Sequence, residues 1–494
     1  MLRVSELEFR KEFDQASTAF DTCWGYLCDI KTATAPVNPE SFLDFQPKLA
    51  SAIAALSCLY ARLSEERRGL VARKSKLSQS WLVKRLRLIG SRQEALNFTI
   101  SIGKCLGDSF AFFFYRNDLQ LLCKHLLEPA ARHLPTGIGG IGEVEFVKKI
   151  KVVGGKMVLY HGITSILRIA DVSLIDLAKF RVAGLGELKS WSPKQGALEI
   201  MLRAIGPGLD LPHISNLDAS PSDRFTSRAE MSPSAKDRLS RQLKKMEESF
   251  KREQITGRAA ARVESRNHLR VFHGLVRKAR RNKFSFLKAD NGLLLGVFRS
   301  PYRSLLAKAT RKLDVADGLV SVESRALVLS LLDITRDDNL LSVGMLVYDP
   351  TGQPLNLAGA APCFWWDLPI KTLRALIFHD VIASTVFNPA HLLASLERAD
   401  FKVEVQPDLQ FRVTKRVGSR VVELTGLIYY FQLIQQCLFT EAFMLQLISQ
   451  FGQLGSDMVG PNDAAKIDLI FNQEISLGLR RYRRHKRKRA SKIG

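Results

Sequence analysis

Two acidic residues and a lysine stand out in an otherwise apolar part of the chain. Asp171 interrupts one apolar run, and Glu187 and Lys189 close a second apolar run after an intervening turn. Alternate residues of a strand share a face, so Glu187 and Lys189 project together if this run is a strand. Adjacent antiparallel strands would then bring all three side chains together. Two carboxylates suit Mg²⁺, and a nearby lysine can orient a water or stabilise a reacting phosphate, which is the chemistry of metal-dependent phosphodiester hydrolysis.

The elements that must position these residues can be read from the surrounding sequence. Residues 156–163, 165–176 and 181–190 are short segments rich in Val, Ile and Leu with Gly or charged breaks, which predicts three strands. Before them, Pro135 and a glycine-rich turn predict the start of a short helix over residues 141–150, which carries Glu143.

The composition of the sequence after these segments predicts a loop, a helix and a basic stretch. Residues 205–235 are dominated by Pro, Ser, Asp and Gly, which predicts a loop or mobile insertion. A charged helix with Gln242 is expected next, followed by a basic stretch over residues 266–284.

At these residues the chain resembles the PD-(D/E)xK, or restriction-endonuclease-like, nuclease superfamily. Asp171 is followed sixteen positions later by the run Glu187-Leu188-Lys189, although Ala170 stands where the superfamily pattern has proline. The resemblance covers residues 135–300 and implies an αβββαβ core. It implies catalytic roles for Asp171, Glu187, Lys189, Glu143 and Gln242. It also implies that Mg²⁺ or Mn²⁺ binds to Asp171, Glu187 and Glu143.

Several other residues have two readings from the sequence. Asp176 rivals Asp171 but lies where a turn should begin. His161 and Arg168 would lie either near the reacting phosphate or in structural roles, and Trp365 and Trp366 either stack on bases or pack in a core. His125 and His133 lack the partners of a zinc site. The glycines at 137, 139 and 142 fit GxGxxG but follow no strand, so a helix-start turn is the better interpretation.

The charge and the cysteine content indicate which kind of partner and which cellular compartment to expect. The 494-residue chain has a formal net charge of +24, which favours a polyanionic partner such as nucleic acid. Residues 479–494 contain no acid and read as a basic, disordered tail. The seven scattered cysteines favour buried thiols in a reducing compartment, and no apolar run is long enough to span a membrane. We therefore expect a cytoplasmic protein without a membrane partner.

The expected fold class is mixed α/β with three folded regions. Residues 1–130 read as a helical region, in which the aromatic cluster at 110–115 is core. Residues 131–300 read as the nuclease core, and residues 301–478 as a further α+β region. Residues 292–300, at the boundary between these two regions, and residues 341–357 predict strands, and residues 424–451 predict one long buried helix.

The function expected from these features is that of a metal-dependent nuclease, with DNA as the expected substrate and defence against foreign DNA as a role by analogy. The alternative is a non-catalytic nucleic-acid-binding or scaffold protein with a nuclease-like fold. The choice between DNA and RNA, strand and sequence specificity, and an oligomer or protein partner stay open at this point.

Overall fold

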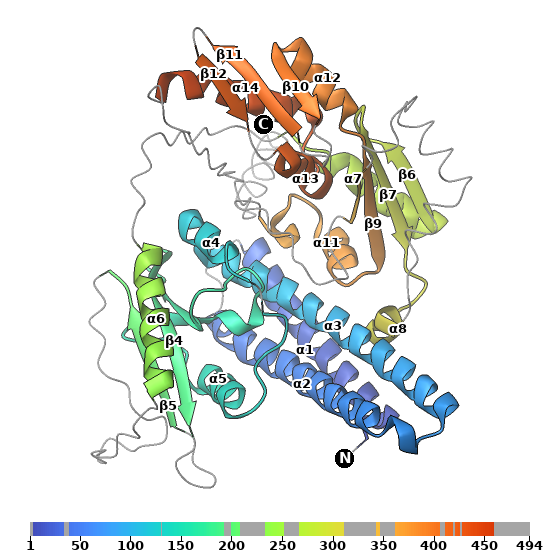
Figure 1. The fold of residues 1–494 in the computed structure, drawn as a ribbon, viewed down its shortest axis with the longest axis vertical. Coiled ribbons are helices and arrows are strands. Elements are labelled where there is room, and N and C mark those ends of the chain that lie inside the picture. Colours follow the sequence, from blue (N-terminus) through green and yellow to red (C-terminus); the bar gives the residue numbers. More distant parts are fainter. Residues whose placement is uncertain are drawn as a thin grey trace, which may run out of the picture. The chain divides into compact units, whose positions relative to one another are not determined.

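The computed structural model shows a chain that folds into two compact units, each made of helices and antiparallel sheets (Figure 1). The mixed α/β class is therefore confirmed. No described helix is long and apolar enough to cross a membrane. The structure describes residues 3–33, 39–129, 131–191, 199–207, 233–250, 266–310, 342–345, 361–405, 411–417, 420–424 and 427–458.

The first unit begins with helices, as the apolar spacing predicts. They are α1 (Glu6–Thr32), α2 (Pro39–Ala72), the short 3₁₀ helix η1 (Lys74–Lys76), α3 (Gln79–Tyr115) and α4 (Leu119–Leu126). The helix α8 (Leu305–Thr310) also belongs to this unit and packs against α3 and α1.

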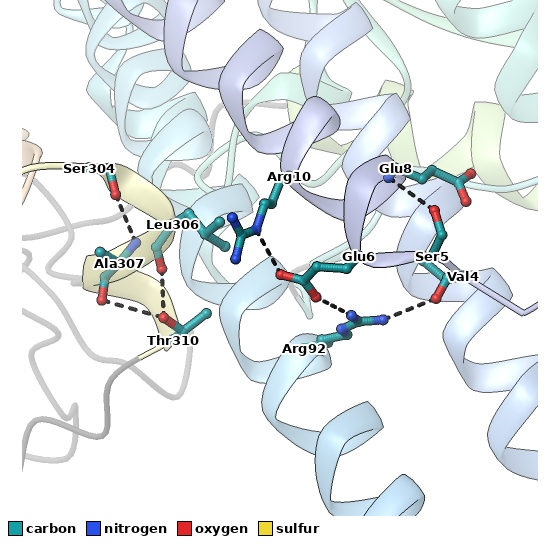
Figure 2. A network of polar contacts seen from close by, with 10 residues as sticks. All are labelled: Val4, Ser5, Glu6, Glu8, Arg10, Arg92, Ser304, Leu306, Ala307 and Thr310. Carbon is teal, nitrogen blue, oxygen red and sulfur yellow. Dashed lines mark hydrogen bonds and ion pairs between the residues drawn. The ribbon is translucent and has the colours of Figure 1, made fainter.

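The start of α1 is tied to α3 by charged side chains. The Ser5 hydroxyl caps α1 by accepting a hydrogen bond from the backbone N–H of Glu8 at 3.1 Å. Figure 2 shows the Glu6 carboxylate held between Arg10 and Arg92. Arg92 also donates to the carbonyl of Val4 at 3.1 Å, which fixes the chain just before the helix.

The core of this unit surrounds the C-terminal half of α3. Phe110, Phe114 and Tyr115 are fully buried, and the rings of Phe45 and Phe110 stack at 4.2 Å between centroids. The expected aromatic core is therefore confirmed. Because α3 is buried on all sides here, its polar residues must find partners inside the protein.

A five-stranded antiparallel sheet completes the first unit. Its order is β1 (Val152–Val153), β2 (Lys156–Tyr160), β3 (Val172–Asp176), β4 (Arg181–Trp191) and β5 (Glu199–Ile205). Helix α5 (Ile138–Lys149) packs on β4 and on α2, and α6 (Pro233–Phe250) packs on β4 and β5. Three of these strands follow the predicted segments, whereas β5 was not predicted.

The order of elements differs from the αβββαβ core that the resemblance implies. In the first unit β5 precedes α6, pairs antiparallel with β4, and no described strand of this unit follows α6. The strands near residue 300, β6 (Phe284–Lys288) and β7 (Leu293–Arg299), belong to the second unit. The expected core boundary at residue 300 therefore lies beyond the first unit, and the helices of 1–130 share that unit with the sheet.

The second unit contains two antiparallel sheets. The first has the order β6-β7-β9-β8, with β9 at Val381–Phe387 and β8 at Ser342–Met345. The second consists of β10 (Phe401–Val405), β11 (Phe411–Val417) and β12 (Arg420–Leu424). The accompanying helices are α7 (Leu269–Asn282), η4 (Cys363–Trp365), α11 (Ile370–Ile377), α12 (Ala390–Arg398), α13 (Leu427–Cys437) and α14 (Glu441–Met458).

The prediction of one long helix over 424–451 is wrong, because the helix is interrupted between α13 and α14. Leu438 has a φ of 56°, and its carbonyl accepts the backbone N–H of His268 at 2.8 Å. The backbone N–H of Thr440 donates to the carbonyl of Arg266 at 3.0 Å. Pairing with a distant segment thus replaces the helical hydrogen bonds. Most of the predicted insertion at 205–235, most of the predicted strand at 341–357, and the basic tail lie outside the described residues.

Candidate functional site

Asp171 lies beside β4 at the point where the chain enters β3. Its backbone N–H donates to the carbonyl of Gly186 at 3.0 Å, and its carboxylate Oδ2 accepts the backbone N–H of Leu188 at 2.7 Å. Ala170 just before it has a φ of 65°, so the backbone turns sharply into the strand. The side chain of Asp171 is therefore held by backbone contacts against the run Glu187-Leu188-Lys189.

Glu187 and Lys189 project together from β4, as the alternation of a strand predicts. The Lys189 Nζ donates to Glu187 Oε1 at 2.7 Å and to Gln242 Oε1 at 3.1 Å. Gln242 comes from α6, which packs on β4 and β5. Glu187 is 2% exposed, so its charge is buried and depends on this partner.

Glu143 comes to the same site from α5. Its Oε2 accepts a hydrogen bond from the Tyr160 hydroxyl at 2.6 Å. Two glycines make the approach possible by lacking side chains. A Cβ on Gly142 would lie 2.0 Å from the Ser190 Oγ of β4, and a Cβ on Gly162 would lie 2.2 Å from the Tyr160 hydroxyl. Close packing of α5 on β4 therefore sets the position of Glu143.

The acids of the site oppose one another electrostatically. Burial raises the pKa of Asp171 well above its usual range, and the charges of Glu187 and Glu143 raise it further. Burial likewise raises the pKa of Glu143, and the charge of Glu187 adds to it, while the Tyr160 hydrogen bond and Lys189 act in the opposite direction. The site thus groups three acids whose simultaneous ionisation is unfavourable, and Lys189 offsets this only in part.

This donor set fits a hard divalent cation. Carboxylate oxygens are the ligands that Mg²⁺ prefers, and Mg²⁺ usually takes only one or two of them and keeps several waters. Within the described part of the chain, no group of three or more His, Cys, Asp or Glu residues is arranged to hold a metal ion. The acids available to a cation here are Asp171, Glu187 and Glu143, of which Mg²⁺ would take one or two.

The loop before Asp171 is fastened to the helices of the first unit. Residues 165–171 were predicted to be strand, but the strand β3 begins only at Val172. The backbone N–H groups of Ser165 and Ile166 donate to the Asp108 carboxylate of α3 at 2.6 and 3.1 Å. Those of Arg168 and Ile169 donate to His125 Nδ1 of α4, at 3.0 and 2.9 Å. Hydrogen bonds to helix side chains thus replace a strand ladder, and the prediction was wrong for this reason.

A chain of buried hydrogen bonds continues from His125 to the residue before Asp171. His125 Nδ1 accepts backbone N–H groups, so its Nε2 carries the proton and donates to the Tyr115 hydroxyl at 3.1 Å. Tyr115 then donates to Ser173 at 2.6 Å, and Ser173 to His161 Nε2 at 2.5 Å. His161 Nδ1 donates to the carbonyl of Ala170 at 3.0 Å. Every member has its partner, and both histidines are neutral.

The other polar candidates near the site have structural roles. His161 is buried in this chain of hydrogen bonds, where burial lowers its pKa to about 4. The Arg168 guanidinium donates to backbone carbonyls of Ser165, Leu126 and Glu128. Asp176 pairs with Lys156 at 2.7 Å and accepts backbone N–H groups of the β3–β4 turn, so it is a turn residue.

The remaining candidates occupy core or turn positions. Trp365 and Trp366 are 5% and 3% exposed, which places them in the core. The His133 ring stacks on Tyr60 at 4.1 Å, and burial lowers its pKa to about 4. Gly137 stands at the N-cap of α5 with a φ of 102°, as the interpretation as a helix-start turn requires.

Two residues of the site were missed from the sequence. Tyr160 ends β2, and its hydroxyl holds Glu143; nothing in its spacing distinguishes it from a core tyrosine. Arg203 is exposed on β5 directly across from Glu187 in the register of the two strands, so it shares the face of the site. An unpredicted strand hid it, although the alternation in residues 199–205 was a usable signal.

Comparison with known proteins identifies no family for the chain. No protein-family model matches the chain, and no curated protein and no solved structure matches it. The site must therefore be interpreted from its own geometry.

Proposed function

We propose that the chain is a metal-dependent nuclease of the PD-(D/E)xK type that hydrolyses phosphodiester bonds, with DNA as its substrate. One observation carries this proposal. Five residues named from the sequence alone come from two helices, a loop and a strand, yet they meet at one site. They are Glu143 on α5, Asp171 before β3, Glu187 and Lys189 on β4, and Gln242 on α6.

Each residue then has a distinct role in the proposed reaction. Asp171 and Glu187 would hold Mg²⁺ or Mn²⁺, which when bound acts as a Lewis acid and lowers the pKa of water. Lys189 brings a fixed positive charge to the attacked phosphate, and Gln242 and Glu187 hold its ammonium in position. Arg203 contacts a substrate phosphate from the neighbouring strand. Tyr160 keeps Glu143 oriented through its hydroxyl.

The test is cleavage of plasmid DNA in Mg²⁺ or Mn²⁺ and in EDTA, with the parent protein and Glu187→Gln. The parent should cleave only with the metal, and the variant should not cleave at all. Glu187→Gln keeps the size of the side chain, so its fold can be checked by circular dichroism. Cleavage by Glu187→Gln at the parent's rate would refute the assignment of the site.

A second measurement reports on the metal without cleavage. A cation that relieves repulsion among buried acids stabilises the folded state by mass action. Mg²⁺ should therefore raise the melting temperature of the parent, and raise that of Glu187→Gln less. Equal shifts in both proteins would place metal binding elsewhere.

The second candidate is a nucleic-acid-binding protein without catalysis. It is favoured by the net charge of +24, which by itself supports affinity for a polyanion but no cleavage. Tight binding of DNA together with no cleavage in any divalent metal would select it.

A further inference from the structure

A stretch of the second unit is dense in positive charge and has no acid. Between Arg266 and Ala289 the sequence holds eight Lys or Arg residues and no Asp or Glu. Helix α7 buries one apolar face, with Phe272 and Val276 on it, so its cations lie on the outer side. The exposed cations at and after its C-terminal end are Arg277, Lys278, Arg280, Arg281 and Lys283. Such a concentration of one sign fits a polyanion.

Aromatic rings follow directly after these cations. Lys283 has a φ of 70° and turns the chain from α7 into β6, which is the edge strand of its sheet. Phe284 and Phe286 share one face of β6, and Phe298 of β7 lies across from Phe284 on that face. The centroids of Phe284 and Phe286 are 5.8 Å apart, and those of Phe286 and Phe298 are 5.1 Å apart.

Phe284 is the open end of this row. Its side chain is 58% exposed, whereas Phe286 and Phe298 are half-buried. The ring of Phe286 lies over Gly296, since a Cβ at Gly296 would come within 2.9 Å of it. The row is thus supported from below by the sheet and presents a ring to solvent beside Lys283.

The frame around the row is fixed by Arg299. Its backbone N–H donates to the carbonyl of Lys283 at 2.7 Å, and its guanidinium donates to the carbonyl of Arg280 at 3.1 Å. The end of α7 and the start of β6 are therefore held together. The cations and the exposed ring are therefore held in fixed positions relative to one another by the protein itself.

We infer that this aromatic–basic patch, defined as Arg280, Arg281, Lys283, Phe284 and Phe286, binds single-stranded nucleic acid. The cations fit the phosphates, and a protein ring can stack on a base only where that base is unpaired and accessible. The bases of an intact duplex already stack on one another, which leaves the ring no partner. The inference goes beyond the nuclease proposal, because the patch lies in the second unit and binds whether or not the first unit cleaves.

The experiment uses the full chain in the Glu187→Gln background with EDTA, so that no substrate is cut. Fluorescence anisotropy measures binding of a labelled oligothymidylate of about 16 nucleotides and of a duplex of equal length. Phe284→Ala should weaken single-strand binding about tenfold and change duplex binding little, since one stacked base is lost. Phe284→Trp should bind at least as tightly as the Glu187→Gln background.

Leu287→Ala is the matched control, because Leu287 is also exposed and apolar on β6 but lies on the opposite face. It should leave both affinities unchanged. Replacing Arg281 and Lys283 by Gln should reduce the salt dependence of single-strand binding, by a slope of about 0.7 for each lost phosphate contact.

Position is tested by photochemical cross-linking to an oligonucleotide that carries 5-iodouracil. The cross-link should map to Phe284 by mass spectrometry. Binding to vesicles of anionic phosphatidylserine is measured with the same variants. Three outcomes would overturn the inference: unchanged single-strand affinity in Phe284→Ala, equal losses of affinity for single strand and duplex, or a loss of affinity for the vesicles alone. The last outcome would assign the patch to a membrane surface. Because all variants carry the inactive site, failure here leaves the nuclease proposal untouched, and the reverse also holds.

Discussion

Lys189 is held in place by two partners, Glu187 and Gln242, so its charge has one position. A fixed charge near the attacked phosphate stabilises the transition state more than it stabilises bound substrate. We predict that Lys189→Ala lowers the single-turnover cleavage rate at saturating Mg²⁺ by about a hundredfold or more. Lys189→Arg should not restore the rate fully, because a planar guanidinium does not replace a compact ammonium.

The control for this prediction is Lys179→Ala, which removes an exposed lysine from the β3–β4 turn. Its cleavage rate should equal that of the parent. Metal binding should change far less in Lys189→Ala than in Asp171→Ala. A Lys189→Ala protein as fast as the parent would mean that the match to the motif is incidental.

Glu441 gives a residue-level prediction about pH in the second unit. Its Oε1 accepts the backbone N–H of Gly292 at 2.6 Å. Burial, together with the nearby charge of Asp290, raises the pKa of Glu441 to about 7, from an ordinary value of 4.5. The folded state therefore favours the protonated acid. This contribution to stability is complete below about pH 4.5 and is lost as the pH rises through about 7.

Glu441→Gln should remove that pH dependence, since glutamine keeps the acceptor for Gly292 and carries no charge. At about pH 8 the variant should be more stable than the parent by about 1–2 kcal/mol, a value reduced for partial screening by solvent. The melting temperatures of the two proteins should converge toward about pH 4.5. Glu397→Gln, which changes an exposed glutamate on α12, should show no such pH-dependent difference. A constant offset at all pH values would contradict the prediction.

At the level of elements, the loop before Asp171 depends on the helices that hold it. Tyr115 of α3 connects His125 of α4 with Ser173 of β3. Tyr115→Phe removes only the hydroxyl and leaves a buried N–H of His125 without its partner. We predict a loss of about 1–3 kcal/mol in stability, the cost of an unsatisfied buried group.

The loss should also be visible in the loop itself. Amide hydrogen exchange of Arg168 and Ile169 should speed up in Tyr115→Phe, because His125 Nδ1 accepts both of these N–H groups. The cleavage rate should fall while KM changes little, since the loop positions Asp171. Tyr60→Phe is the control, because Tyr60 stacks on His133 outside this chain of hydrogen bonds. Equal exchange in both variants would contradict a positioning role for Tyr115.

The sequence indicated which side chains would lie together better than it predicted the elements that carry them. Strand alternation was enough to place Glu187 and Lys189 on one face. Glu143 and Gln242 were named from the resemblance to the nuclease superfamily and not from their spacing. Asp171 does lie beside β4, as predicted, but a hydrogen-bonded loop holds it there and not a strand. Partners such as Asp108, more than fifty residues away, leave no local signal in the loop they bind. The break at Leu438 was hidden in the same way.

For the whole molecule, cleavage and binding should be separable, because they rest on different charges. The tail after Leu479 contains nine Lys or Arg residues, whereas the proposed site would use two acids and one lysine. Glu187→Ala should abolish cleavage and keep DNA affinity nearly unchanged. Removing residues 480–494 should weaken affinity and flatten its dependence on salt, by a slope of about 0.9 for each lost duplex phosphate contact.

Binding titrations over a range of salt concentrations measure this difference. A tail of the same length with Gln in place of Lys and Arg is the matched control, and it should behave like the truncated protein. An equal loss of affinity in Glu187→Ala and in the truncated protein would show that the two functions are not separable.

The bonds from Asp108 and His125 to the loop before Asp171 bear on how such a site can be transmitted between proteins. A gene segment that encoded only residues 131–250 would carry the motif but lack the side chains that shape its loop. We expect a transferred segment to hold Asp171 in the same way only if the helices of the first 130 residues accompany it. A change at these contacts in α3 or α4 should then require a matching change in the loop.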